Sequence, residues 1–100
     1  MTIDIRKTAD STVAVLCGSF DTLAAESIAG EFESLKDSLD GNVVLDCTAV
    51  DYISSSGLRL LLSLRKAAKA KNKVITLLNV HPNIMEVLTV THFDRMFNIK

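Results

Sequence analysis

Short apolar runs and helical apolar stripes alternate along this chain. The runs at Thr12–Cys17, Val43–Leu45 and Val74–Leu78 are nearly continuous, as in strands that are covered on both faces. Thr2–Lys7 alternates weakly and predicts a first strand at a sheet edge. Between the runs the apolar spacing changes to three and four residues, which is the period of a helix.

Three helices are expected between and after these strands. The first carries an apolar stripe at Ala24, Ile28, Phe32, Leu35 and Leu39. Asp21 or Thr22 is expected to cap its start, and Gly41 supplies the residue that a left-handed C-cap prefers. The second helix runs from Leu58 into a basic stretch, and the third opens at Pro82, which suits a first helical position.

Strands that alternate with helices predict the α/β class. With short connections the crossovers are right-handed, so we expect a mixed, mostly parallel sheet of four to five strands with helices packed against it. The apolar tail from Phe93 to Ile99 is expected to dock on the core as a short helix or a strand. Residues 1–100 are expected to form a single domain, because 100 residues is close to the commonest domain size.

Composition narrows the classes of function. The chain carries 11 basic and 12 acidic residues, a net charge of −1, which argues against nucleic acid as a partner. Its apolar runs fall short of the roughly 18 residues that span a bilayer, so no membrane insertion is expected. Cys17 and Cys47 form no metal-binding pattern and no glycine-rich phosphate loop is present, so no cofactor is expected. We expect a cytoplasmic protein with both thiols reduced.

The charged residues are unevenly spread along the chain. From Asp21 to Asp51 there are eight acidic residues and one basic residue, whereas from Arg59 to Lys73 there are six basic residues and no acidic one. Two solvated helix faces of opposite sign explain this distribution most simply. The alternative is a surface whose oriented charge steers a protein partner.

Three consecutive serines, Ser54–Ser56, stand where the second helix is expected to begin. The first N–H groups of a helix are unpaired and its dipole is positive there, so this spot suits either a capping hydroxyl or a phosphate. We expect the preceding strand to stop at Asp46 and a tight connection to follow. The segments 18–22 and 46–57 both follow strands, and we expect them to converge at the carboxyl edge of the sheet.

Four segments carry a resemblance to a known family. They are Gly18–Asp21, Val43–Asp46, Ile53–Leu58, and Val74–Leu78 followed by Pro82. Together they resemble the STAS domain of the anti-sigma factor antagonist (anti-anti-sigma factor) family, over nearly the whole chain. The resemblance implies a STAS-like fold. The chain departs from the family at Ser54, where aspartate is common, and at Thr91–Phe93, where Gly-Leu often stands.

The resemblance also implies which residues carry the site. Ser56, directly before Gly57, takes the position at which the family is phosphorylated, and Ser54 and Ser55 remain alternatives. The implied phosphosite neighbourhood and partner-binding surface comprise Asp21, Asp46, Ser54, Ser55, Gly57, Leu58 and Arg59.

By the same resemblance, the chain is similar to partner-switching regulators that have no catalytic activity of their own. The unphosphorylated form is expected to bind a serine-kinase anti-sigma factor or a related switch kinase. That kinase, with ATP and magnesium, is expected to phosphorylate Ser56 and so break the complex, and a serine phosphatase is expected to reset it.

Two other functions are compatible with the same residue types. One is a soluble accessory subunit of a membrane transport system, which would use the same fold. The other is a serine hydrolase in which Ser56, His81 or His92, and Asp46 form a triad. The sequence disfavours the hydrolase, because it has no Gly-x-Ser-x-Gly elbow.

Overall fold

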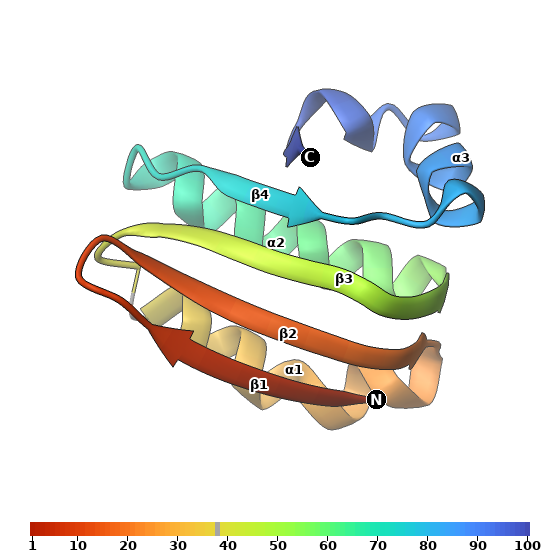
Figure 1. Cartoon of the computed structure of the whole chain (residues 1–100), viewed down its shortest axis with the longest axis horizontal. Helices are drawn as coiled ribbons and strands as arrows, with labels where there is room; N and C mark the ends of the chain where they lie inside the picture. Colours follow the sequence, from red (N-terminus) through yellow and green to blue (C-terminus); the bar gives the residue numbers. More distant parts are fainter. Residues whose placement is uncertain (38) are drawn as a thin grey trace.

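The structure, a computed structural model, describes residues 1–37 and 39–100. Within these residues, five strands form one sheet in the order β1-β2-β3-β4-β5 (Figure 1). The elements are β1 (Thr2–Lys7), β2 (Ser11–Phe20), α1 (Thr22–Asp37), β3 (Asn42–Ile53), α2 (Ser55–Ala70), β4 (Ile75–Leu78), α3 (Pro82–Val90), the 3-10 helix η1 (Phe93–Arg95) and β5 (Asn98–Ile99).

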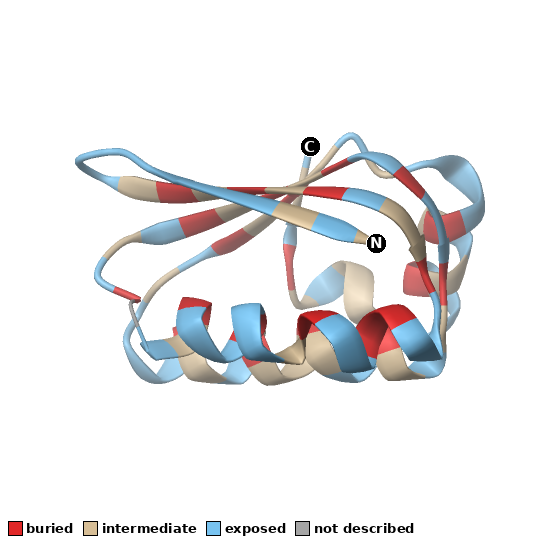
Figure 2. Cartoon of the chain, turned by 90° about the horizontal axis from the view of Figure 1, so that it is seen from below, coloured by how far each residue is buried: buried red, intermediate tan, exposed pale blue. Residues whose placement is uncertain are grey.

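The sheet is parallel except at one edge. β1 pairs antiparallel with β2, and the pairs β2–β3, β3–β4 and β4–β5 are all parallel. Figure 2 shows α1 and α2 together beneath one face of the sheet, and Figure 1 shows α3 beyond the end of β4. The expected α/β fold with a mixed, mostly parallel sheet is confirmed, and so is the edge strand at Thr2–Lys7.

The core lies between the sheet and these two helices. Alternation along β2 buries Ala14 and Leu16, which project toward the helices. The rings of Phe20 and Phe32 meet edge to face, with centroids 6.0 Å apart, where β2 and α1 join. The largest fully buried side chains are Phe20, Phe32, Leu16, Leu45, Leu64, Leu77, Leu88 and Val43.

Strand β3 is longer than its sequence suggests. It was expected to stop at Asp46, but it continues to Ile53. Its register with β2 shifts opposite Val15–Cys17 and again opposite Gly18–Ser19, because β3 contributes an extra residue at each place. These bulges put consecutive residues on the outer face, and the alternation that marks a strand is lost there.

The end of α1 also differs from the expectation. The helix ends at Asp37, and Gly41 is not a left-handed C-cap, since Gly18 is the one described glycine with a positive φ. Glycine is required at position 41 for a different reason: a Cβ there would lie 2.5 Å from the carbonyl oxygen of Asp10. The chain therefore needs glycine at this crossing for space.

β2 runs from Ser11 to Phe20 and so continues three residues past the expected run Thr12–Cys17, because the chain stays extended through Gly18 and Ser19. The start of α3 and the C-terminal tail agree with the sequence. α3 has Pro82 in its first turn, as predicted. The C-terminal tail was expected to form a short helix or a strand, and it forms both, because η1 is followed by the short strand β5. Phe97, between them, is buried in the core.

Candidate functional site

The three serines lie where β3 turns into α2. Ser54 is the N-cap residue: its backbone is extended, with φ −95° and ψ 171°, and its Oγ accepts the N–H of Gly57 at 3.1 Å. The carbonyl of Ser54 accepts the N–H of Leu58 at 3.0 Å, which starts the helical ladder. The hydroxyl of Ser54 is therefore used as a cap.

Ser55 and Ser56 are the first two residues of α2. Ser55 is exposed and Ser56 is half-buried. Within residues 1–37 and 39–100, no hydrogen bond engages the hydroxyl of either serine. Both stand in the first turn, where backbone N–H groups lack intrahelical acceptors and the helix dipole is positive. The start of α2, Ser54–Gly57, is called the helix mouth below.

The end of β2 holds the helix mouth in place. The N–H of Ser54 donates to the carbonyl of Phe20 at 2.8 Å. Gly57 is buried, and a Cβ on it would lie 2.9 Å from Cδ1 of Phe20 and 3.0 Å from Cγ1 of Ile53. Glycine thus lets the first turn of α2 rest directly on the Phe20 ring.

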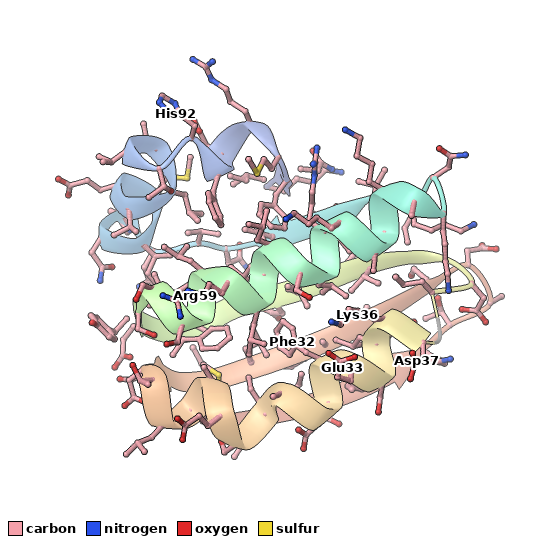
Figure 3. All side chains as sticks on the ribbon, turned by 180° about the vertical axis from the view of Figure 1, so that it is seen from behind. Phe32, Glu33, Lys36, Asp37, Arg59 and His92 are labelled. Carbon is pink, nitrogen blue, oxygen red and sulfur yellow. The ribbon has the colours of Figure 1, made fainter. Side chains whose placement is uncertain are left out.

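Other residues of the implied neighbourhood lie close by. Asp21 follows Phe20, and its Oδ1 accepts the N–H of Ala24 at 2.8 Å, so it caps α1 as expected. Leu58 is half-buried against the core. Arg59 is exposed near the start of α2, one turn after Ser56 (Figure 3).

Asp46 lies elsewhere, which corrects the expectation that it neighbours the serines. It pairs with Val15 and Leu78 inside the sheet, about 20 Å along the strand from Ser54. Its Oδ1 accepts the hydroxyl of Thr48 at 2.6 Å and the N–H of Thr48 at 3.0 Å, and these bonds lower the pKa of Asp46. Because β3 continues past it, Asp46 fixes a bulge and does not reach the helix mouth.

A set of polar contacts ties this bulge to the start of α3, and the sequence did not reveal it. Nδ2 of Asn79 donates to Oγ1 of Thr48 at 2.9 Å. Nε2 of His81 is 2.6 Å from the carbonyl oxygen of Thr48 and must carry the proton, since a carbonyl only accepts. Asn79 and His81 follow β4 directly, so their place after a parallel strand was the available signal.

A second set of contacts lies nearer the helix mouth. Nδ2 of Asn83 donates to the carbonyl of Asp51 at 2.9 Å, and Oδ1 of Asp51 accepts the hydroxyl of Ser19 at 2.7 Å. The ends of β2 and β3 and the start of α3 are thereby joined. The two segments 18–22 and 46–57 do converge, through the part of the second segment that follows the bulges.

These contacts separate the groups that a serine hydrolase would need. His81 and Asp46 both bind Thr48, and within the described residues no hydrogen bond joins Ser56 to His81, His92 or Asp46. The described part of the chain holds no group of three or more His, Cys, Asp or Glu side chains that could bind a metal ion. None of its helices is long and apolar enough to cross a membrane.

The fold and the helix mouth define a small α/β domain whose distinctive chemistry is a pair of unengaged hydroxyls at the start of a helix. The chain belongs to the STAS domain family, whose model matches residues 2–100. It is 31% identical over 87 residues to BtrV of Bordetella bronchiseptica, which is assigned as an anti-sigma factor antagonist. That match covers 87% of this chain and 75% of BtrV.

Solved structures agree with this family. An anti-sigma-factor antagonist (STAS) domain protein from Planctomyces limnophilus superposes with a TM-score of 0.84 at 27% identity, over 97% of this chain and 87% of that one. SpoIIAA of Bacillus in its phosphorylated form superposes with a TM-score of 0.76, over 99% of this chain and 91% of that one. At 19% identity, the likeness to SpoIIAA supports the fold alone.

Proposed function

We propose that this protein is an anti-sigma factor antagonist of the partner-switching type, with no catalytic activity of its own. Unphosphorylated, it binds a serine-kinase anti-sigma factor or a related switch kinase through the helix mouth. The kinase transfers the γ-phosphoryl group of MgATP to the hydroxyl of Ser56, releasing ADP and a proton, and the complex separates. A serine phosphatase hydrolyses the phosphate and restores binding, all in the cytoplasm, where ATP is available.

One observation carries this proposal: of the three serines at the helix mouth, one caps the helix and two keep their hydroxyls available. Ser54 is engaged as the cap, whereas the hydroxyls of Ser55 and Ser56 have no partner among the described residues. The family resemblance selects Ser56 of these two, because it directly precedes Gly57. The exposed Ser55 is the alternative acceptor.

Phosphorylation at this place should switch contacts without unfolding the domain. A phosphate adds a charge of about −1.5 to −2 and three acceptor oxygens. At the first turn of α2 the unpaired N–H groups and the helix dipole favour that charge. A partner packed over the helix mouth would have to bury it, at a cost of several kcal/mol unless the charge is paired. The free protein therefore tolerates the phosphate and the complex does not.

Arg59 connects the two states of the switch. It lies three residues after Ser56, so the two side chains share one side of α2. In the unphosphorylated protein the exposed guanidinium is available to a carboxylate of the partner. A phosphate on Ser56 would compete for the same guanidinium and withdraw that contact.

The test is phosphorylation of the purified protein by a serine-kinase anti-sigma factor of the same organism, with ATP and magnesium. Mass spectrometry of the digested product should place one phosphate on Ser56, and Ser56→Ala should abolish incorporation. Ser55→Ala is the matched control and should be phosphorylated like the wild type. Full incorporation into Ser56→Ala, with loss in Ser55→Ala, would move the acceptor to Ser55, and no incorporation at all would overturn the proposal.

A further inference from the structure

A basic groove lies at the opposite end of α2 from the helix mouth. It has a volume of about 330 Å³ and is formed by the end of α2, the start of β4 and the segment after η1. Its basic side chains are Arg65, Lys69 and Lys73, and its apolar side chains are Val74, Ile75 and Met96. We propose that this groove docks an acidic segment of a protein partner.

The positive charge of the groove is not neutralised by the chain itself. None of the described residues that line it carries a carboxylate. In the described residues the ion pairs are Arg6–Asp4 and Lys36–Glu33, so none of the three groove cations is paired. Unpaired positive side chains around a concave surface attract an anionic ligand and raise its local concentration there.

Arg65 is already oriented for such a ligand. Its Nε donates to the carbonyl of Met96 at 3.2 Å, and the side chain is half-buried. Within the described residues no hydrogen bond engages its two terminal nitrogens. A guanidinium already held by one hydrogen bond loses little conformational entropy when its terminal nitrogens bind a carboxylate in a bidentate arrangement.

The apolar side chains explain why the ligand is a segment of protein. Val74 is 49% exposed and Met96 is half-buried, and both line the groove, so they present apolar surface there. A bare phosphate ion would leave this surface uncovered. Arg65 and Lys69 are four residues apart on α2, about 6 Å along its axis, which matches the about 6.8 Å between alternate residues of an extended chain. An extended segment with alternating carboxylates therefore meets both cations and covers the apolar floor.

The groove is independent of the state of Ser56. Ser56 is the second residue of α2 and Lys69 the fifteenth, so they are about 20 Å apart along the helix. The Debye length is about 10 Å at 0.1 M salt, and a phosphate at the helix mouth is largely screened at the groove. A partner docked in the groove stays bound while the helix mouth exchanges its own partner. This inference goes beyond the proposed switch and does not depend on it.

The probe is a fluorescent peptide of about ten residues in which glutamate alternates with valine, long enough to span the groove. Anisotropy should show binding to the whole protein, and NMR should map the largest shifts to Val74 and Met96.

The double variant Lys69→Gln, Lys73→Gln should bind about tenfold more weakly, the effect of losing two partly exposed charge pairs. The matched control Lys7→Gln, Lys66→Gln loses the same net charge outside the groove and should bind within about twofold of the wild type. Ser56→Asp should not change the affinity.

Several results would overturn the proposal. Equal weakening in both double variants would mean that the peptide responds to net charge and not to the groove. A peptide that does not bind, or that shifts resonances elsewhere, would remove the docking site. Vesicles containing phosphatidylserine serve as a second ligand, and groove-dependent binding to them without peptide binding would assign the groove to a membrane surface. Thermal melts of both double variants check that each is folded.

Discussion

Gly57 is the residue at which the helix mouth has least spare room. The first turn of α2 touches the ring of Phe20, and a methyl group at position 57 would meet Cδ1 and Cγ of that ring at 2.9 and 3.0 Å. Both partners belong to rigid elements, the end of β2 and the start of a helix, so neither can move freely. The size of Gly57 therefore sets where the serines stand.

We expect Gly57→Ala to lower the free energy of unfolding by about 1–3 kcal/mol, the usual cost of overpacking a core contact. Gly30→Ala is the matched control, because it makes the same change inside α1 where nothing lies within 4 Å of the new Cβ. That control should raise the free energy of unfolding by about 0.5–1 kcal/mol, since glycine is costly within a helix. Urea unfolding of both variants measures the two values. A Gly57→Ala protein as stable as Gly30→Ala would show that α2 does not rest on Phe20.

At the scale of elements, β3 shows what the sequence could and could not predict. The run Val43–Leu45 predicts a strand because every residue is apolar. Beyond it the bulges break the alternation, and the outward polar residues resemble a loop, so the strand was expected to end at Asp46, seven residues early. The apolar residues Val50 and Ile53 were the remaining signal, because both still point into the core.

The candidate site was also predictable only in part: the sequence predicts its local features but not the contacts between distant segments. The serines were expected at the start of α2, and Ser54–Gly57 lies there because capping chemistry is local. The expected position of Asp46 failed because it depended on the length of β3. The contacts of Asn79, His81 and Asp51 join three elements that are distant in sequence, and only the arrangement of the sheet reveals them.

The bulge at Asp46 gives a prediction of pH dependence. The hydroxyl and N–H of Thr48 lower the pKa of Asp46 from 3.8, so its carboxylate stabilises the fold at neutral pH. The sign follows from linkage: this contribution is present above pH 3.8 and is lost as the pH falls through the lowered pKa. Asp46→Ala should therefore be less stable than the wild type at pH 7, with a difference that shrinks below pH 3.8.

Unfolding experiments across this pH range measure the difference. Thr48→Val removes the hydroxyl and keeps the backbone N–H, so it should reproduce part of the loss, with the same direction of pH dependence. A difference between wild type and Asp46→Ala that does not change with pH would mean that the ionised carboxylate contributes nothing at the bulge.

At the scale of the whole molecule, opposite charges lie on two neighbouring helices. α1 carries acidic residues and α2 carries basic ones, and Nζ of Lys36 on α1 donates to Oγ of Ser63 on α2 at 2.7 Å. Figure 3 shows Lys36 with Glu33 and Asp37 on α1 and Arg59 on the adjacent α2. Both helices cover the same face of the sheet. A partner that approaches this face therefore meets negative charge on α1 and positive charge on α2.

If this surface steers the partner, salt should act on the rate of association. Raising the salt concentration from about 0.01 to 0.15 M shortens the Debye length from about 30 to 8 Å, so association should slow while dissociation changes little. Stopped-flow mixing with the partner kinase at several salt concentrations measures both rates. An association rate that is independent of salt would mean that the two charged helix faces serve only solvation.

The central claim is that phosphate on Ser56 releases the partner by its local charge and leaves the fold intact. The direct measurement is calorimetric titration of the partner kinase with unphosphorylated protein and with protein phosphorylated at Ser56, alongside thermal melts of both forms. We expect the phosphorylated form to bind at least about a hundredfold more weakly, because several kcal/mol of desolvation must be met in the complex. Its melting temperature should stay close to that of the unphosphorylated form, since the start of α2 favours a negative charge. Equal affinity of the two forms would contradict the account, and so would a phosphorylated form that melts far below the other, because the switch would then act through the fold.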